Sequence, residues 1–150
     1  MTKKLPPNPL QTEILKAVSS AKTKVEKVNL LREYRSPALV SLLIWNFDES
    51  ITSALPEGVV PYEPNDKPIG DGISRLVSNQ RMLYNFVTGG NIDLSRTRRE
   101  SLFIELLESL HKDEAELLCL VKDKNIGKKY RVTKNVVAEA YEDIKWGNRA

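Results

Sequence analysis

Residues 36–47 read SPALVSLLIWNF, and this stretch decides the fold that we expect for the chain. Ser36 and Pro37 supply a helix cap followed by a first-turn proline, which is a common start of a helix. The residues behind them are apolar on almost every side, and a helix of that kind is normally buried. The same apolar spacing would permit a strand, but the cap and the proline favour a helix. We therefore predict a central buried helix over residues 36–47.

Amphipathic helices are predicted on both sides of this segment, because apolar residues recur there at helical spacing. These predicted helices span residues 8–21, 23–35, 73–87, 95–110, 113–123 and 133–141. Asn8, Ser95 and Thr133 are candidate caps, and Thr23 with Glu26 forms a capping-box pattern. A weak helical turn is also expected at residues 51–55. The fold class that follows is all-α, a compact bundle of six or seven short helices in a single domain spanning residues 1–150.

The two helical halves are joined by a long loop at residues 56–72, which contains four prolines and three glycines. Prolines lack the backbone donor and glycines resist ordering, so neither helix nor sheet interior is expected there. Pro61, Tyr62 and Pro64 form a strip with polyproline spacing that could dock in an aromatic groove of a partner. The alternative, which we favour, is that the loop crosses its own domain and buries Val60 and Tyr62.

The two ends of the chain are also expected to lie outside the bundle. We predict a flexible arm at residues 1–7 and a flexible tail at residues 146–150. The longest mostly apolar stretch is about half of what a bilayer-spanning helix needs, so no contact with a membrane is expected. The sequence leaves the oligomeric state open.

The chain contains few of the side chains that commonly act in catalysis, since it has one histidine and one cysteine. His111 falls in a polar turn near the end of the 95–110 helix, where a cation is favoured by the helix dipole. Cys119 lies in an apolar run and is expected to behave as a small core hydrophobe. The carboxylates at positions 105, 108, 114 and 116 fall where a solvated helix face would place them. We therefore predict no enzymatic activity, no catalytic residues, no metal site and no cofactor.

Arginines gather at the start of the 95–110 helix, where Arg96, Arg98 and Arg99 oppose the helix dipole. Guanidinium groups beside free backbone N–H groups would suit a phosphate or an acidic protein surface. The alternative is that Asp93 and Glu100 neutralise them locally.

A second basic segment connects the last two predicted helices, and Lys128, Lys129 and Arg131 are its candidate contacts with an anionic partner. This connection is too long for the tight turn of a helix-turn-helix motif, and the helix that follows is acidic. Solvated surface is therefore the default interpretation of the basic loop at residues 122–134.

Several elements give the chain a family resemblance. They are RESLFIELLESLH at 99–111, EAELL at 114–118, VKDK at 121–124, LPEG at 55–58, PY at 61–62 and GGN at 89–91. Together they resemble an uncharacterised family of small proteins encoded by contractile-tailed bacteriophages, especially those infecting marine cyanobacteria. The resemblance covers nearly the whole chain. It implies a viral protein expressed inside a bacterium, and it brings no catalytic residues.

The function that we expect is a non-enzymatic phage accessory protein that binds a phage or host macromolecule in the host cytoplasm. A partner protein is favoured, and nucleic acid is the alternative partner, bound through Arg96, Arg98, Arg99 and the basic loop. A virion structural or assembly component is the rival function, in which the arm and the tail would contact neighbouring subunits.

Overall fold

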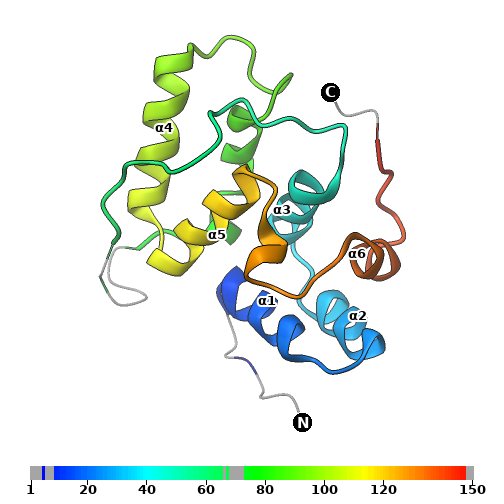
Figure 1. Ribbon diagram of the computed structural model, residues 1–150. Helices are drawn as coiled ribbons and strands as arrows, with labels where there is room; N and C mark the ends of the chain where they lie inside the picture. The colour runs from blue at the N-terminus through cyan, green and yellow to red at the C-terminus, as the bar shows by residue number, and fades with distance from the viewer. Residues whose placement is uncertain (1–4, 6–8, 66, 68–72, 148–150) are drawn as a thin grey trace.

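The computed structural model describes residues 5, 9–65, 67 and 73–147, and within them the fold is all-α, as predicted (Figure 1). Regular β-structure in this part is limited to two isolated bridges. The predicted arm lies almost entirely outside the described residues, as do positions 148–150 of the predicted tail. The elements are α1 (Gln11–Ser20), α2 (Lys24–Glu33), α3 (Pro37–Phe47), the 3-10 helices η1 (Leu76–Ser78) and η2 (Gln80–Phe86), α4 (Arg96–Ser109), α5 (Lys112–Lys122), the 3-10 helix η3 (Ile126–Lys128) and α6 (Lys134–Ala140).

The central helix α3 begins as its sequence predicts. Ser36 Oγ accepts a hydrogen bond from Leu39 N at 3.1 Å, and Pro37 occupies the first turn. Leu39, Leu42 and Leu43 are completely buried. The helix packs against α5 and against both η1 and η2, so it contacts the second half of the chain directly.

A second buried helix, α5, shares the centre with α3. Leu117, Leu118 and Val121 have no exposed surface, and the helix contacts α1, α3 and α4. The hydrophobic core that the two helices organise is continuous and includes residues of every helix in the described part.

The last helix, α6, returns to the beginning of the chain and packs beside α2, as Figure 1 shows. Tyr141 Oη, just after α6, donates to Leu31 O at 2.6 Å, and burial raises the pKa of this phenol. Arg35 binds both carboxylate oxygens of Asp143, at 2.8 and 2.6 Å. Helices from the first and second halves of the sequence therefore pack against each other around one core.

Two predicted helical segments have different structures. Residues 51–55 are not helical, and Ser53 instead pairs with Val87 in an antiparallel bridge. The predicted helix at 73–87 is replaced by η1 and η2. The side-chain amides of Asn79 and Asn85 donate to Arg75 O and Met82 O, at 2.7 and 3.0 Å. Side-chain donors of this kind satisfy carbonyls that α-helical N–H groups would otherwise use, which favours the tighter, interrupted turns.

The proline-rich loop crosses the surface of its own domain, the alternative that we favoured. Val60 and Tyr62 are half-buried against the core. Glu108 Oε2 accepts from Glu63 N at 2.8 Å, and the ammonium group of Lys122 donates to Pro56 O at 2.6 Å. Positions 66 and 68–72 of the predicted loop lie outside the described residues.

Candidate binding site

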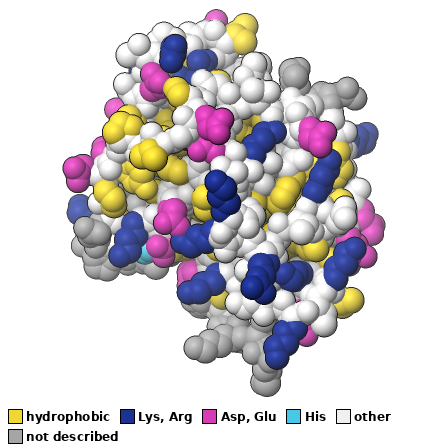
Figure 2. Space-filling view, viewed as in Figure 1, with side chains coloured by type: hydrophobic (Ala, Val, Ile, Leu, Met, Phe, Trp, Pro, Cys, Tyr) yellow, Lys and Arg dark blue, Asp and Glu magenta, His cyan; other side chains and the backbone are white. Residues whose placement is uncertain are grey.

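Part of the predicted basic loop is seated on the first two helices. Lys27 Nζ on α2 donates to Arg131 O at 2.6 Å, and Arg131 N donates to Ser19 Oγ on α1 at 2.9 Å. These contacts join the loop to lysines that the sequence analysis did not select. We use the name basic face for the resulting set: Lys16 of α1, Lys27 of α2, and Lys128, Lys129 and Arg131. Figure 2 shows Lys and Arg side chains gathered on the lower half of the molecule, over α1, α2 and the segment before α6.

The basic face keeps an excess of positive charge. Lys129 pairs with Glu116, and its hydrogen bond to that carboxylate raises the pKa of the lysine. Lys16, Lys128 and Arg131 form no ion pair with any carboxylate in the described part of the chain. Lys27 donates to a carbonyl, which is neutral, so its charge is also uncompensated by a direct ion pair. Unpaired cations that share one face attract an anionic partner.

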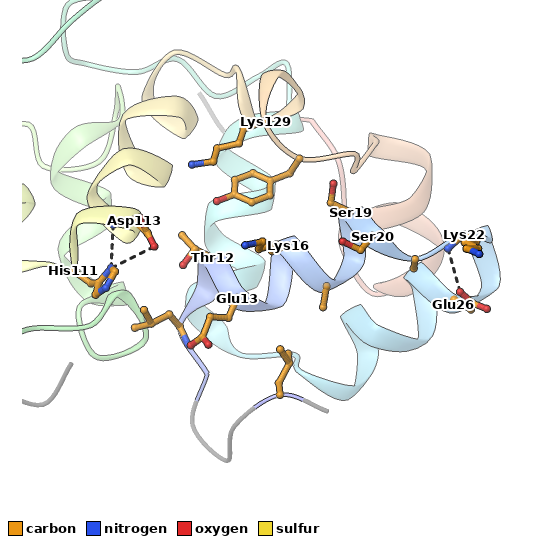
Figure 3. A pocket seen from close by; sticks show the side chains of 15 residues that line it. Thr12, Glu13, Lys16, Ser19, Ser20, Lys22, Glu26, His111, Asp113 and Lys129 are labelled. Carbon is orange, nitrogen blue, oxygen red and sulfur yellow. Dashed lines mark hydrogen bonds and ion pairs between the residues drawn. The ribbon is translucent and has the colours of Figure 1, made fainter. Parts of the chain in front are cut away.

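A groove of about 980 Å³ runs along α1 beside the basic face (Figure 3). Its lining on α1 consists of two adjoining stripes at the helical spacing i, i+4, i+7, so the outer face of the helix forms one wall. These stripes are Thr12, Lys16, Ser19 and Glu13, Ala17, Ser20. In Figure 3, His111 and Asp113 lie at one end of the groove, Lys22 and Glu26 lie at the other, and Lys129 lies above α1.

Two of the carboxylates that line the groove are already engaged within the fold. Glu13 Oε1 accepts from Leu10 N at 2.9 Å, and Glu26 Oε2 accepts from Lys22 N at 3.2 Å. Asp113 lies beside His111 at one end of the groove. The ammonium groups of Lys16 and Lys22 have no carboxylate partner among the described residues. These two lysines are therefore available to a ligand along the length of α1.

His111 caps α5, a role that differs from the one predicted. Its Nδ1 accepts a hydrogen bond from Asp113 N at 3.1 Å, which requires that this nitrogen carry no proton. The residue therefore satisfies an open donor at the start of α5. The helix predicted at 113–123 therefore begins one residue earlier, at Lys112.

The three arginines at the start of α4 have different surroundings. Arg99 points into the fold, where it donates to Asn85 O at 2.8 Å and to Asn91 O and Leu94 O at 3.0 Å each. Arg98 lies 3.5 Å from Glu105, and Arg96 is exposed. In Figure 1 the start of α4 lies at the top of the view and the loop before α6 crosses its lower middle, so the fold does not unite the two predicted basic segments.

One of the four predicted surface carboxylates is buried, which corrects the sequence interpretation. Glu114 has no exposed surface; it accepts from Leu76 N at 2.9 Å and from Gln11 N at 2.8 Å. Its burial raises the pKa of the carboxyl group. Glu105, Glu108 and Glu116 are exposed, as predicted. Glu114 is a structural connection between α5, α1 and η1.

Lys122 is also buried, although it belongs to the basic loop that was expected to be solvated. Its ammonium group is enclosed by Pro56 O, Gly58 O and Asp123 Oδ1, at 2.6, 3.1 and 2.6 Å. Lys122 therefore fastens the proline-rich loop and is not available to a partner.

The proline-rich strip presents some of its predicted docking residues. Pro61 and Pro64 are exposed, whereas Tyr62 is half-buried and hydrogen-bonded to Cys119. Burial raises the pKa of the Cys119 thiol to about 11, so the thiol is protonated at neutral pH. A protonated, partly buried thiol agrees with the packing role expected for this residue.

Among the described residues, no group of three His, Cys, Asp or Glu side chains is close enough to hold a metal ion. The helices of the same part of the chain are all too short or too polar to span a bilayer.

The comparisons with known proteins give one match. The family model described as "Family of unknown function (DUF6433)" matches residues 14–128, which is about three quarters of the chain. This range includes α2 to α5 and most of α1. No curated protein and no solved structure matches the chain.

Proposed function

We propose that the chain, which belongs to the family of unknown function DUF6433, is a non-enzymatic phage accessory protein that binds a phage or host macromolecule. The observation that supports this proposal is the basic face, where cations of α1, α2 and the loop before α6 come together. Four of its five cations have no direct carboxylate partner among the described residues. The sequence resemblance supports the bacteriophage part of this proposal, and with it we propose that the protein acts in the cytoplasm of the infected host.

The basic face is suited to binding because its backbone is prearranged. The contacts from Lys27 and Ser19 hold the loop at Arg131 before any partner arrives. A fixed loop loses less conformational entropy on binding than a free one, so more of the interaction energy contributes to affinity. Charge on such a surface also accelerates encounter with an anionic partner.

The test compares charge reversals at the two basic regions of the molecule. Tagged wild-type protein, Lys128→Glu/Arg131→Glu and the control Arg81→Glu/Arg96→Glu are expressed during phage infection and purified with their partners. The control changes the charge equally at exposed positions outside the basic face. We expect the basic-face variant to lose at least about 90% of the bound partner, since each lost charged contact costs about 1.5–3 kcal/mol. The control should retain it.

The opposite pattern would refute the proposal. If the Arg81→Glu/Arg96→Glu protein loses the partner and the basic-face variant keeps it, binding takes place at η2 or the start of α4. Unfolding curves of both variants provide the control for folding. Recovery of the protein in purified virus particles, at a fixed number of copies per particle, would instead favour the virion component.

A further inference from the structure

We infer that the groove along α1 binds an acidic segment of a protein that also carries apolar side chains. The inference rests on the proposed function, because the basic face borders this groove and shares Lys16 and Lys129 with it. It adds the class of partner and the place where the partner lies.

Charge complementarity favours an acidic ligand. Lys16 lies midway along the groove and Lys22 at one end, as Figure 3 shows, and neither ammonium has a carboxylate partner among the described residues. Arg131 and Lys27 continue the positive charge from the Ser19 side. A ligand with carboxylates spaced along its length would compensate charges that the fold leaves unpaired.

The same lining argues for a protein segment over nucleic acid. The carboxylates of Glu13, Glu26 and Asp113 also line the groove. A nucleic-acid strand carries a phosphate about every 3.4 Å, so it would place charges against these carboxylates. A polypeptide can place its acidic residues opposite the lysines and neutral residues opposite the acids.

Apolar surface between the charged groups gives the ligand a second kind of contact. Ala17 and Leu5 are half-buried in the lining, and Leu10 and Ala21 contribute their remaining surface. Apolar side chains buried there would contribute about 25 cal/mol for each Å² removed from water. The ten residues of α1 span about 15 Å, which matches four or five extended residues or about ten helical ones.

The experiment uses a display library of random 12-residue peptides selected on the whole protein. We expect the selected peptides to be rich in Asp and Glu together with Leu, Ile or Phe. A fluorescent peptide with the consensus sequence should bind wild type at least tenfold more tightly than Lys16→Glu/Lys22→Glu, measured by anisotropy. Binding to Arg81→Glu/Arg96→Glu should be unchanged. Ala17→Gln, which adds bulk at a half-buried helix position without changing charge, should also weaken binding.

Binding of a 20-base-pair nucleic-acid duplex to the protein is measured as well, because nucleic acid is the competing class of ligand. Tighter binding of the duplex than of the selected peptide, or selection without acidic residues, would overturn the inference. If selection fails while the Lys128→Glu/Arg131→Glu variant still loses its partner in infected cells, the inference is wrong and the proposed function stands. If that variant keeps its partner while the peptides bind as expected, the groove is a binding site and the loop at Lys128 and Arg131 is not.

Discussion

Glu114 and Lys122 show how much of the chemistry of this chain depends on contacts between distant residues. Each is a charged residue next to other charged residues in the sequence, which is typical of a solvated helix face. Each is nevertheless buried, because Glu114 binds backbone N–H groups 38 and 103 positions away and Lys122 binds carbonyls of the proline-rich loop. Sequence periodicity could not predict their burial, since the partners that make it tolerable come from other elements.

The burial of Glu114 leads to a prediction about pH. Its pKa is raised in the folded protein above the ordinary value of 4.5, so the native state holds the proton more tightly than the unfolded state. The contribution of this proton to stability is complete below pH 4.5 and is lost as pH rises through the raised pKa. Between the two pKa values, the free energy of unfolding falls by at most about 1.4 kcal/mol per pH unit.

Glu114→Gln removes this titration and isolates its contribution. Denaturant unfolding of both proteins between pH 4 and pH 8 gives the difference in unfolding free energy, variant minus wild type. We expect this difference to rise with pH above 4.5 and then to level off. A difference that is constant with pH would show that the pKa of Glu114 is the same in both states.

Gly90 provides a prediction from close packing of the backbone. A Cβ at this position would lie 1.9 Å from Tyr84 O, which is an impossible contact, so the 84–90 turn would have to shift. Gly90→Ala should therefore destabilise the fold by about 1–3 kcal/mol, the usual cost of overpacking. Gly127→Ala is the matched control, because a Cβ there meets nothing within 4 Å. Equal midpoints of chemical unfolding for the two variants would contradict the packing argument.

At the scale of single elements, helix starts could be predicted well where a capping side chain precedes an apolar pattern. Ser36, Ser95 and Thr133 accept hydrogen bonds from the first turns of α3, α4 and α6, as their types and positions indicated. The region 73–87 has an apolar helical pattern too. Its two asparagines satisfy carbonyls locally, and periodicity alone does not detect this competition.

The proline-rich loop gives a prediction at this scale. Glu108→Ala removes the acceptor for Glu63 N and should loosen the strip that carries Pro61 and Pro64. Limited proteolysis should then cut within residues 57–65 several times faster than in wild type, because cleavage requires a locally free chain. Glu105→Ala, an exposed carboxylate on the same helix, should leave the rate unchanged. Equal rates in all three proteins would mean that Lys122 and the apolar contacts suffice to hold the loop.

At the scale of the whole molecule, the sequence predicted the class of fold and one central helix but not the arrangement of its halves. Nothing in the pattern of α6 indicates that its partner is α2, about 110 positions earlier. Only part of the candidate binding site could be predicted, again because the sequence pattern does not show which distant elements pack together. Lys128, Lys129 and Arg131 are evident as a basic run, whereas Lys16 and Lys27 join them only because the chain returns to α1 and α2.

Amide hydrogen exchange tests the arrangement of the core. The amides of Leu42 and Leu43 in α3 and of Leu118 in α5 lie in fully buried helical turns, so we expect them to exchange only through global unfolding. The amides of η2 should exchange much faster through local opening, because this element is a short 3-10 helix with weaker hydrogen bonds. Equal protection in η2 and α3 would mean that the fold opens as one unit.

The pairing of α6 with α2 has a consequence for synthesis on the ribosome. Val28 and Leu31 of α2 are buried in the fold, but α6, which packs beside α2, is made only after position 133. At about 5–20 residues per second, this apolar surface stays open for roughly 5–20 seconds of elongation. The nascent chain is therefore exposed to chaperones and to aggregation until α6 emerges, and α2 reaches its final packing only after that.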